Sequence, residues 1–207
     1  MEYLILLILI AITFLCLVST VLYLLVHVGI FGNITVCVGK PVIQNVCIGY
    51  KTYTGSYKNC GANFSAAFTL FPQLQSIGIY YENPYKCTKD PAYELDYAVG
   101  LILAEGDHKP DPKIVKTLEK EGYKMTELPA IEYAVQAKFP LVFDVCSVIG
   151  SWRVYPILTN FINKKRLSAH PFIEIYTPGT IHYLAPLSKQ SDFFVPGVSY
   201  RPDNYVS

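Results

Sequence analysis

The sequence lacks the short motifs that mark several large classes of enzyme. It contains no GxSxG, no Walker phosphate-binding loop and no GxGxxG, so nothing in it supports an α/β-hydrolase nucleophile, a P-loop nucleotidase or a dinucleotide-binding domain. Its four histidines form no ligand-spaced cluster with each other or with cysteine, and we therefore predict no metal site and no cofactor. The net charge is only +1 at pH 7, which gives no basic footprint for direct nucleic-acid binding.

Charge is missing altogether from residues 3–31, which contain no Asp, Glu, Lys or Arg. A helix needs about 20 apolar residues to cross a bilayer, and in lipid a helix satisfies its own backbone hydrogen bonds. A cleaved signal peptide has a basic start and an apolar run of roughly 7–15 residues, and this segment has neither. We therefore predict a membrane anchor helix over residues 1–32, with His27 near its exit and Tyr3 and Tyr23 as interfacial residues.

The basic residues near the anchor all follow it. No Lys or Arg precedes the segment, whereas Lys40, Lys51 and Lys58 come after it. Positive charge favours the cytosolic side of a membrane, so we predict a lumenal N-terminus and a cytosolic domain. The alternative is a lumenal domain, in which case the sequon at Asn63 would be glycosylated, while that at Asn33 lies too close to the membrane.

The cysteines have no pairing pattern. Of six cysteines, Cys16 lies in the predicted anchor, and the other five follow without a CxxC spacing. An odd number of cysteines suits reduced thiols in the cytosol better than a disulfide framework.

Hydrophobic patterning after the anchor predicts one domain over residues 33–200, followed by a short end over 201–207. We expect two halves, at about 40–104 and 122–188, each with a strand, a helix and two further strands. Asp111 and Gly122 suit the two ends of a connecting helix over 111–122. The expected strands are 41–57, 76–81, 94–103, 131–139, 172–176 and 180–187, and the expected helices are 62–74 and 145–162. Pro156 must kink the second of these helices or mark a new start.

The two halves also align locally, with residues 76–81 against residues 171–176. This alignment matches Tyr81 with Tyr176 and Ile79 with Glu174. Together with the repeated element order it favours an internal duplication. We therefore predict an α+β fold of two βαββ halves, with a pseudo-symmetric antiparallel sheet, helices on one face, and the other face or a central cleft open to a ligand.

Glu174 breaks the apolar pattern of its predicted strand. A period of two places Ile173 and Ile175 on one face and Phe172, Glu174 and Tyr176 on the other. If the isoleucines pack under the helices, the carboxylate points outward between two aromatic rings. Partly desolvated there, it would have a raised pKa and could act as a general base or acid, or bind a cationic or amide-bearing ligand. The alternative is a solvent-facing glutamate on an edge strand.

Aromatic residues complete the predicted ligand site. The sequence has 17 tyrosines, and tyrosines can line a pocket with flat apolar faces and polar tips, although most are expected to pack in the core. Trp152, the only tryptophan, is expected in the core or in a pocket wall. The predicted ligand-binding residues are Glu174, Tyr176, Phe172, Tyr81, Trp152 and Tyr183.

These features resemble the GyrI-like small-molecule-binding family. Residues 172–176 with 184–187 resemble its closing hairpin, and residues 79–84 resemble the matching strand end of its first half. The resemblance extends over nearly the whole chain. It rests on segments that follow one another in the same order along the sequence, namely 43–46, 80–84, 98–106, 173–176, 181–183 and 192–196. It implies a fold that binds small hydrophobic ligands. Some members open strained cyclopropane rings by hydrolysis, which implies Glu174 as the general base with Tyr176 beside it.

The order of these segments behind an anchor is similar to a membrane-anchored member of the family. The resemblance implies a single-pass protein of the endoplasmic reticulum membrane, also present at the nuclear envelope. Such a protein serves as a selective autophagy receptor for the reticulum and as an adaptor for the valosin-containing AAA ATPase in the repair of DNA–protein crosslinks. The receptor role uses a disordered acidic tail that binds autophagy modifiers, and the sequence ends at Ser207 without one. Either the sequence is a truncated form or the protein lacks that activity. We favour the adaptor, because the tether and the resemblance both serve recruitment, with a GyrI-like binder or hydrolase of strained hydrophobic xenobiotics as the alternative.

Overall fold

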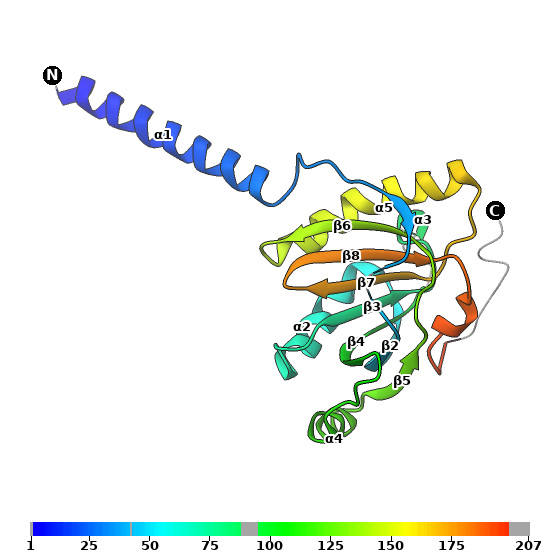
Figure 1. Ribbon diagram of the computed structural model, residues 1–207. Coiled ribbons are helices and arrows are strands. Elements are labelled where there is room, and N and C mark those ends of the chain that lie inside the picture. Colours follow the sequence, from blue (N-terminus) through cyan, green and yellow to red (C-terminus); the bar gives the residue numbers. More distant parts are fainter. Residues whose placement is uncertain (1, 42, 88–94, 199–207) are drawn as a thin grey trace.

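The structure is a computed structural model that describes residues 2–41, 43–87 and 95–198. A long helix projects from a domain built around one sheet (Figure 1). The helices are α1 (Glu2–His27), α2 (Cys60–Leu70), α3 (Pro84–Cys87), α4 (Pro112–Lys120) and α5 (Val145–Lys165), with 3-10 turns η1 (Tyr57–Asn59) and η2 (Gln190–Phe193). The strands are β1 (Cys37–Gly39), β2 (Val46–Gly55), β3 (Ser76–Tyr80), β4 (Leu95–Glu105), β5 (Lys124–Leu128), β6 (Ala134–Leu141), β7 (Phe172–Thr177) and β8 (Gly179–Pro186).

The predicted N-terminal helix is confirmed. α1 has 26 residues, none of which is buried against the domain, and its rise of 1.5 Å per residue gives a length of about 39 Å. Its mean hydropathy of 3.0 over an 18-residue window suits a membrane span. The helix ends at His27, short of residue 32 where the predicted anchor ends, and the next residue, Val28, is buried in the core of the domain.

Within the described residues the sheet has eight strands in the order β1-β6-β8-β7-β3-β4-β2-β5. Every neighbouring pair is antiparallel. Apart from the 3-10 turn η1 and the short α3 between β3 and β4, each half has the element order βαββ. In each half the third strand lies between the first and the second, giving β2-β4-β3 and β6-β8-β7. The strand order is therefore symmetric about the β3–β7 pair, while descent from a duplicated sequence stays a prediction.

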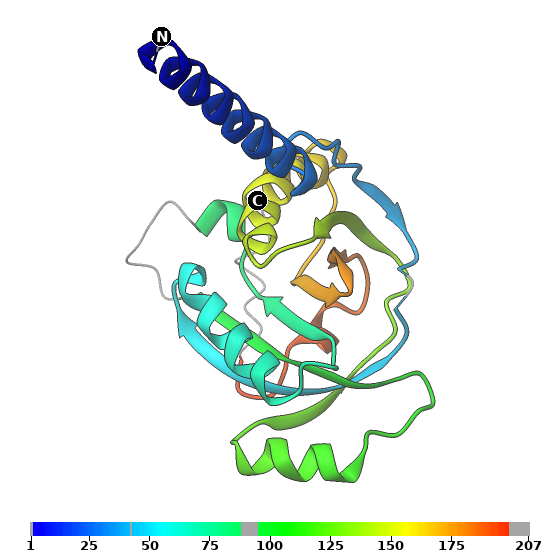
Figure 2. The same cartoon turned by 90° about the vertical axis from the view of Figure 1, so that its left-hand side faces the viewer.

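Two layers of side chains cover the two faces of the sheet. α2 and α5 lie on the same face (Figure 2), and residues of both helices belong to or pack against one core cluster with Phe172 and Tyr183. The opposite face carries a second cluster that includes Ile173 and Ile175 and is covered by the chain around Phe193. The predicted placement of the helices on one face is thus observed for α2 and α5.

Several predicted boundaries change. α5 runs unbroken through Pro156, so the alternative of a new helix start there is wrong. β1, β5 and α3 were not predicted, because segments of three to five residues are too short to show a period. The cap at Asp111 is confirmed, since its carboxylate accepts a hydrogen bond from the Lys113 backbone amide at 2.8 Å. The predicted end over 201–207 and the first residue of the predicted strand 94–103 lie outside the described residues.

Candidate functional site

Glu174 lies at the centre of the sheet with its carboxylate enclosed by hydroxyl groups. The residue is 1% exposed. Its Oε1 accepts hydrogen bonds from Tyr155 at 2.6 Å and from Ser151 at 3.4 Å. Its Oε2 accepts hydrogen bonds from Tyr176 at 2.6 Å and from Tyr80 at 3.3 Å. Short bonds from Tyr155 and Tyr176 thus satisfy one oxygen each of a carboxylate that has almost no contact with water. The single Ser151 proton is shared with the Ser147 carbonyl oxygen at 2.9 Å.

Three elements bring these donors together. Ser151 and Tyr155 lie four residues apart in α5, so both face the sheet from one side of the helix. Tyr176 is two residues from Glu174 in β7 and shares its face, while Tyr80 comes from the neighbouring β3. The site therefore joins the two halves of the sheet under α5.

Electrostatics keep protons on the donors. Burial raises the pKa of Glu174, although the hydrogen bonds from the four hydroxyls oppose this shift. Burial and, second, the Glu174 charge raise the pKa of Tyr80, Tyr155 and Tyr176 well above the usual value. The tyrosines therefore stay neutral near pH 7 and can donate to the ionised carboxylate.

Cys60 borders the network at the start of α2. Its Sγ lies 3.5 Å from the Tyr80 hydroxyl, and burial raises the pKa of the Cys60 thiol to about 11. A thiol with that pKa stays protonated near neutral pH and is a weak nucleophile. The cysteines whose side chains the structure describes, Cys16, Cys37, Cys47, Cys60 and Cys146, are free thiols.

Tyr183 is the predicted site residue that lies beside Glu174 without bonding to it. The two residues are register partners across β7 and β8, and Tyr183 is 1% exposed. Burial first, and then the Glu174 charge, raise the pKa of Tyr183, while Ser151 lowers it. No hydrogen bond of ordinary distance and angle nevertheless reaches the Tyr183 hydroxyl from the described residues. Tyr183 thus contributes its aromatic ring to the wall of the cluster. Its ring packs edge to face with that of Tyr155, and the two ring centroids are 5.4 Å apart.

The grouping of Phe172, Glu174 and Tyr176 on one face is confirmed, but the expected orientation of that face is wrong. Glu174 points toward α2 and α5, and Ile173 and Ile175 pack on the opposite face. A strand period of two separates the two sets of side chains but does not say which set the helices cover. The edge-strand alternative is also wrong, because β7 lies between β8 and β3.

Tyr81 does not belong to this cluster. Its hydroxyl accepts a hydrogen bond from the Val195 amide at 3.3 Å on the opposite face of the sheet, and its ring packs on Phe194. Tyr80 is the residue that reaches Glu174, so the local alignment of Tyr81 with Tyr176 is wrong by one position. A shift of one residue moves a strand side chain to the other face.

The prediction that Trp152 lies in the core or in a pocket wall is also wrong. Its side chain is 74% exposed on the outer side of α5. Ser151 and Tyr155, which the prediction did not select, supply the helix side of the cluster. Their spacing of four residues, with a hydroxyl at both positions, was the available signal.

The arrangement accounts for a satisfied buried carboxylate more directly than for an open catalytic site. A general base has to lie within hydrogen-bond reach of a substrate proton, and here four protein donors occupy that reach. A pocket of about 150 Å³ lies away from Glu174 and is lined by Gln136, Lys138 and His182, among others. No group of three or more His, Cys, Asp or Glu side chains that could hold a metal occurs in the described part of the chain.

Two curated proteins match the sequence over most of its length. It is 37% identical over 170 residues to the testis-expressed protein 264 homolog of Mus musculus. The aligned region covers 82% of this chain and 54% of that protein. It is 36% identical over 182 residues to testis-expressed protein 264 of Homo sapiens. Here the aligned region covers 88% of this chain and 57% of that protein. The chain is a homologue of testis-expressed protein 264. It spans about half the length of these testis-expressed protein 264 relatives.

Other comparisons add little. No protein-family model matches the sequence. An uncharacterized conserved protein from Listeria innocua aligns with a TM-score of 0.45 at 10% identity, over 74% of this chain and 92% of that one. The C-terminal domain of EcmrR aligns with a TM-score of 0.41 at 14% identity, over 76% of this chain and 98% of that one. These likenesses are loose, so the GyrI-like assignment stays a prediction.

Proposed function

We propose that this homologue of testis-expressed protein 264 is a single-pass protein of the endoplasmic reticulum membrane that displays its domain to the cytosol. The observation that carries the proposal is α1, a helix of 26 residues without a buried side chain. In water such a helix would leave a long row of apolar side chains exposed, which soluble monomers avoid. In lipid the same surface is favourable. The basic residues that follow α1 support the cytosolic side.

Membrane insertion and sidedness are tested in microsomes carrying the full chain. We expect the chain to stay in the pellet after alkaline carbonate extraction and its domain to be digested by added protease. A glycosylation tag placed before Met1 should acquire a glycan, while the sequon at Asn63 should not. A glycosidase-sensitive mobility shift that disappears in Asn63→Gln would place the domain in the lumen and overturn the proposed orientation.

We propose that the displayed domain serves as a protein-binding adaptor, and that the valosin-containing AAA ATPase is its partner. Homology to testis-expressed protein 264 and the membrane tether support recruitment as the role. The test is co-purification of the ATPase with the full chain from solubilised membranes, compared with α1 fused to an unrelated domain. Equal recovery with both would contradict the adaptor role. The same placement would suit a reticulum-autophagy receptor, for which co-recovery of autophagy modifiers is the corresponding test.

Glu174 favours a second candidate, a GyrI-like binder or hydrolase of small hydrophobic compounds. A buried carboxyl with a raised pKa among aromatic rings is a feature shared with many functional sites. A ligand would have to displace one of the tyrosines that enclose it. Turnover of a cyclopropane-bearing probe by the parent and its loss in Glu174→Gln, with ATPase recovery retained, would support the enzyme. A parent without measurable turnover would remove the hydrolase from consideration.

A further inference from the structure

Six apolar side chains form an exposed surface where α1 meets the domain. We call this surface the exit patch, and its residues are Phe31, Val142, Phe143, Val145, Val148 and Trp152. Trp152 is 74% exposed, Val148 69% and Phe31 65%. Singly exposed apolar residues are common on soluble proteins, but several at one place mark a surface that contacts something apolar. Asp144, between Phe143 and Val145, is an exposed charged residue among them.

The end of α1 is fixed beside the exit patch. Val28 is buried in the domain core. The Arg153 guanidinium donates hydrogen bonds to the carbonyl oxygens of Gly29 and of Gly32, the latter at 2.8 Å. Gly29 has a φ of +82° and packs so closely that a Cβ there would lie 2.7 Å from Pro140 Cγ. The anchor therefore leaves the domain at a defined place rather than through a loose linker.

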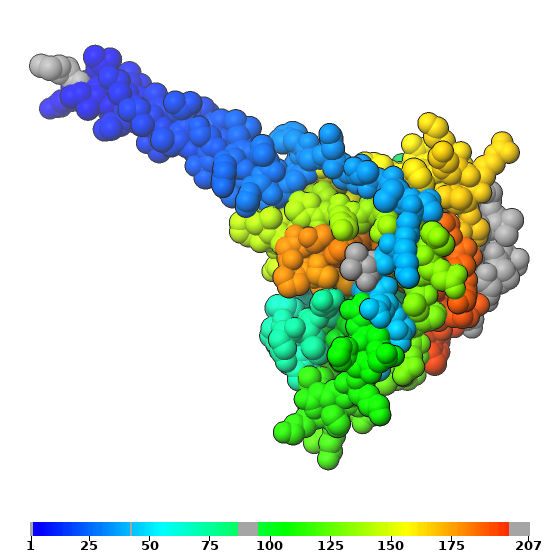
Figure 3. Space-filling model, in the orientation of Figure 1, coloured from blue at the N-terminus to red at the C-terminus, as the bar shows by residue number. Residues whose placement is uncertain are grey.

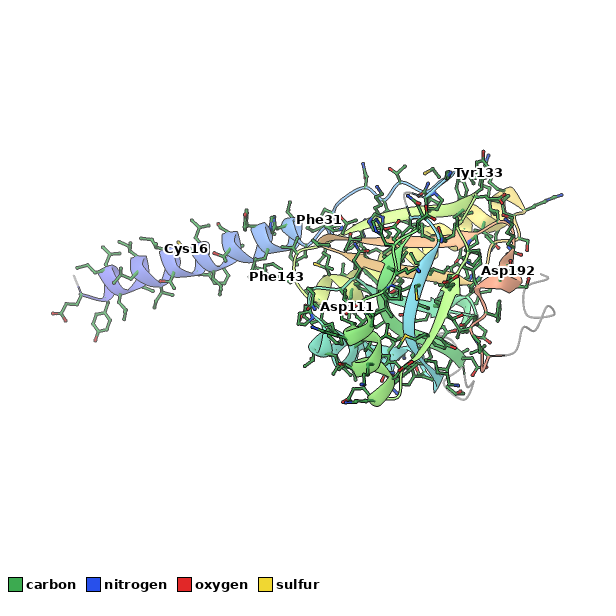
Figure 4. The ribbon with its side chains drawn as sticks, turned by 60° about the horizontal axis from the view of Figure 1, so that its bottom comes forward. Cys16, Phe31, Asp111, Tyr133, Phe143 and Asp192 are labelled. Carbon is green, nitrogen blue, oxygen red and sulfur yellow. The ribbon has the colours of Figure 1, made fainter. Side chains whose placement is uncertain are left out.

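The figures show the same arrangement. Phe31 and Phe143 lie near each other at the base of α1, whereas Tyr133 and Asp192 lie at the far end of the domain (Figure 4). Figure 3 shows the yellow-green chain that leads into α5 directly below the end of the blue helix. A bilayer that contains α1 would therefore meet the exit patch first.

The outer side of α5 changes character along its length. Val145, Val148 and Trp152 are spaced by three and four residues and form one exposed apolar stripe. Further along, Ile157 is 40% exposed, and the exposed residues after it are Asn160, Asn163, Lys164, Lys165 and the C-cap residue Arg166. The most exposed apolar side chains of α5 are thus in its first half, next to the anchor, and its last turn is polar, which fits a partner surface that approaches from the anchor side.

We propose that the exit patch docks on the lipid bilayer, with Trp152 at the level of the headgroups. The proposal rests on the proposed function, because α1 has to span the membrane to bring the lipid to this surface. Trp is enriched at the membrane–water interface, and an amphipathic helix can lie in the interface with its apolar face in the acyl boundary. The first half of α5 takes that role, and the domain is held at a fixed angle to the membrane.

The tryptophan that defines the patch also provides the measurement. Trp152 is the only tryptophan of the sequence, so the tryptophan fluorescence of the full chain comes from this one site. The chain is reconstituted into phosphatidylcholine vesicles whose acyl chains carry bromine at a shallow position. We expect blue-shifted emission, loss of most of its intensity to the brominated lipid, and weak quenching by aqueous acrylamide.

Two variants serve as controls. Trp152→Phe combined with Tyr133→Trp moves the tryptophan to a site that is 60% exposed at the far end of the domain, and brominated lipid should leave its emission unchanged. Val148→Asp places a charge in the patch and should reduce quenching of Trp152. Because Val148 is an exposed residue, the melting temperature of this variant should match that of the parent.

The outcomes separate the docking from the anchor on which it rests. A chain that does not float with the vesicles after a carbonate wash overturns both the anchor and the docking. A chain that floats but has Trp152 quenched by acrylamide and not by brominated lipid overturns the docking alone. A floating chain with Trp152 shielded from both quenchers also overturns it, because another protein surface then covers the patch.

Discussion

At the scale of single residues, the Glu174 network predicts which tyrosine hydroxyls matter. Tyr155→Phe removes a donor at 2.6 Å from a buried carboxylate oxygen, and hydrogen bonds to charged groups contribute about 1.5–3 kcal/mol. We expect a loss of unfolding free energy in that range, measured by denaturant titration of the full chain in detergent. Tyr176→Phe should behave alike, because its hydroxyl is also at 2.6 Å.

Tyr183→Phe is the matched control for these variants. It removes an equally buried hydroxyl from the same layer, but one without a hydrogen-bond partner in the described structure. Loss of an unsatisfied polar group is neutral or stabilising. An equal loss of stability in Tyr155→Phe and Tyr183→Phe would show that ring packing, and not the bond to Glu174, explains the result.

The pH dependence of stability should reveal the proton on Glu174. Burial raises the pKa of Glu174 above its usual value of 4.5, so the folded chain keeps this proton in a pH range where the unfolded chain has lost it. The contribution of Glu174 to stability therefore falls as pH rises above about 4.5 and levels off once the folded carboxyl ionises. The advantage of Glu174→Gln over the parent should grow with pH in denaturant titrations. A difference that does not change with pH would contradict this account.

His170 should act in the opposite direction. Burial lowers the pKa of His170 from 6.5 to about 4, so below pH 6.5 the unfolded chain binds a proton that the folded chain refuses. Stability should fall as pH drops from 6.5 toward 4 and then level off. His170→Gln should flatten this part of the stability profile. Burial and, second, the Lys138 charge also lower the pKa of His182. His182→Gln should therefore flatten the stability profile in the same direction, and it is measured beside His170→Gln to separate the two contributions.

At the scale of elements, the sequence predicted the long or regular segments and missed the short ones. The residues of β3 and β7 were identified because each lies in a short run rich in apolar, β-branched and aromatic residues. The side of each strand that faces the helices could not be read from the period. Tyr81 was chosen in place of Tyr80 because residues 76–81 were aligned with residues 171–176. Trp152 was misjudged for a similar reason, since both sides of the first half of α5 are apolar.

The approach of α5 to the sheet predicts a difference between two helical glycines. A Cβ on Gly150 would lie 2.5 Å from the Tyr183 hydroxyl and 3.0 Å from Phe139 Cδ1, whereas one on Gly61 in α2 would meet nothing within 4 Å. Gly150→Ala should destabilise the chain by about 1–3 kcal/mol through overpacking. Gly61→Ala should stabilise it by up to about 1 kcal/mol through helix propensity. Thermal unfolding of both variants checks the pair, and a stabilised Gly150→Ala would show that α5 can move outward.

At the scale of the whole molecule, the sheet and the anchor have different origins in the sequence. The anchor was predicted from composition alone, because an apolar run of this length without charge is long enough to span a bilayer as a helix. The sheet order depends on contacts between segments almost 100 residues apart, such as the pairing of Gly78 with Glu174. The sequence supplied the repeated βαββ order but not the β3–β7 junction, and the enclosed Glu174 is a product of that junction and of α5 above it.

The connection between anchor and domain leads to a prediction about Arg153. Its guanidinium bonds the carbonyls of Gly29 and Gly32 across more than 120 positions of sequence, and it is the side chain that ties the anchor exit to α5. Arg153→Ala should weaken this tie by about 1 kcal/mol, or about fivefold in amide exchange over residues 28–32. Hydrogen exchange of the full chain in nanodiscs measures it. Arg153→Lys should be intermediate, because an ammonium lacks the planar fork that reaches two acceptors. Lys164→Ala, at the far end of α5, should leave the exchange unchanged. If all three variants exchange like the parent, the buried Val28 holds the exit without help from Arg153.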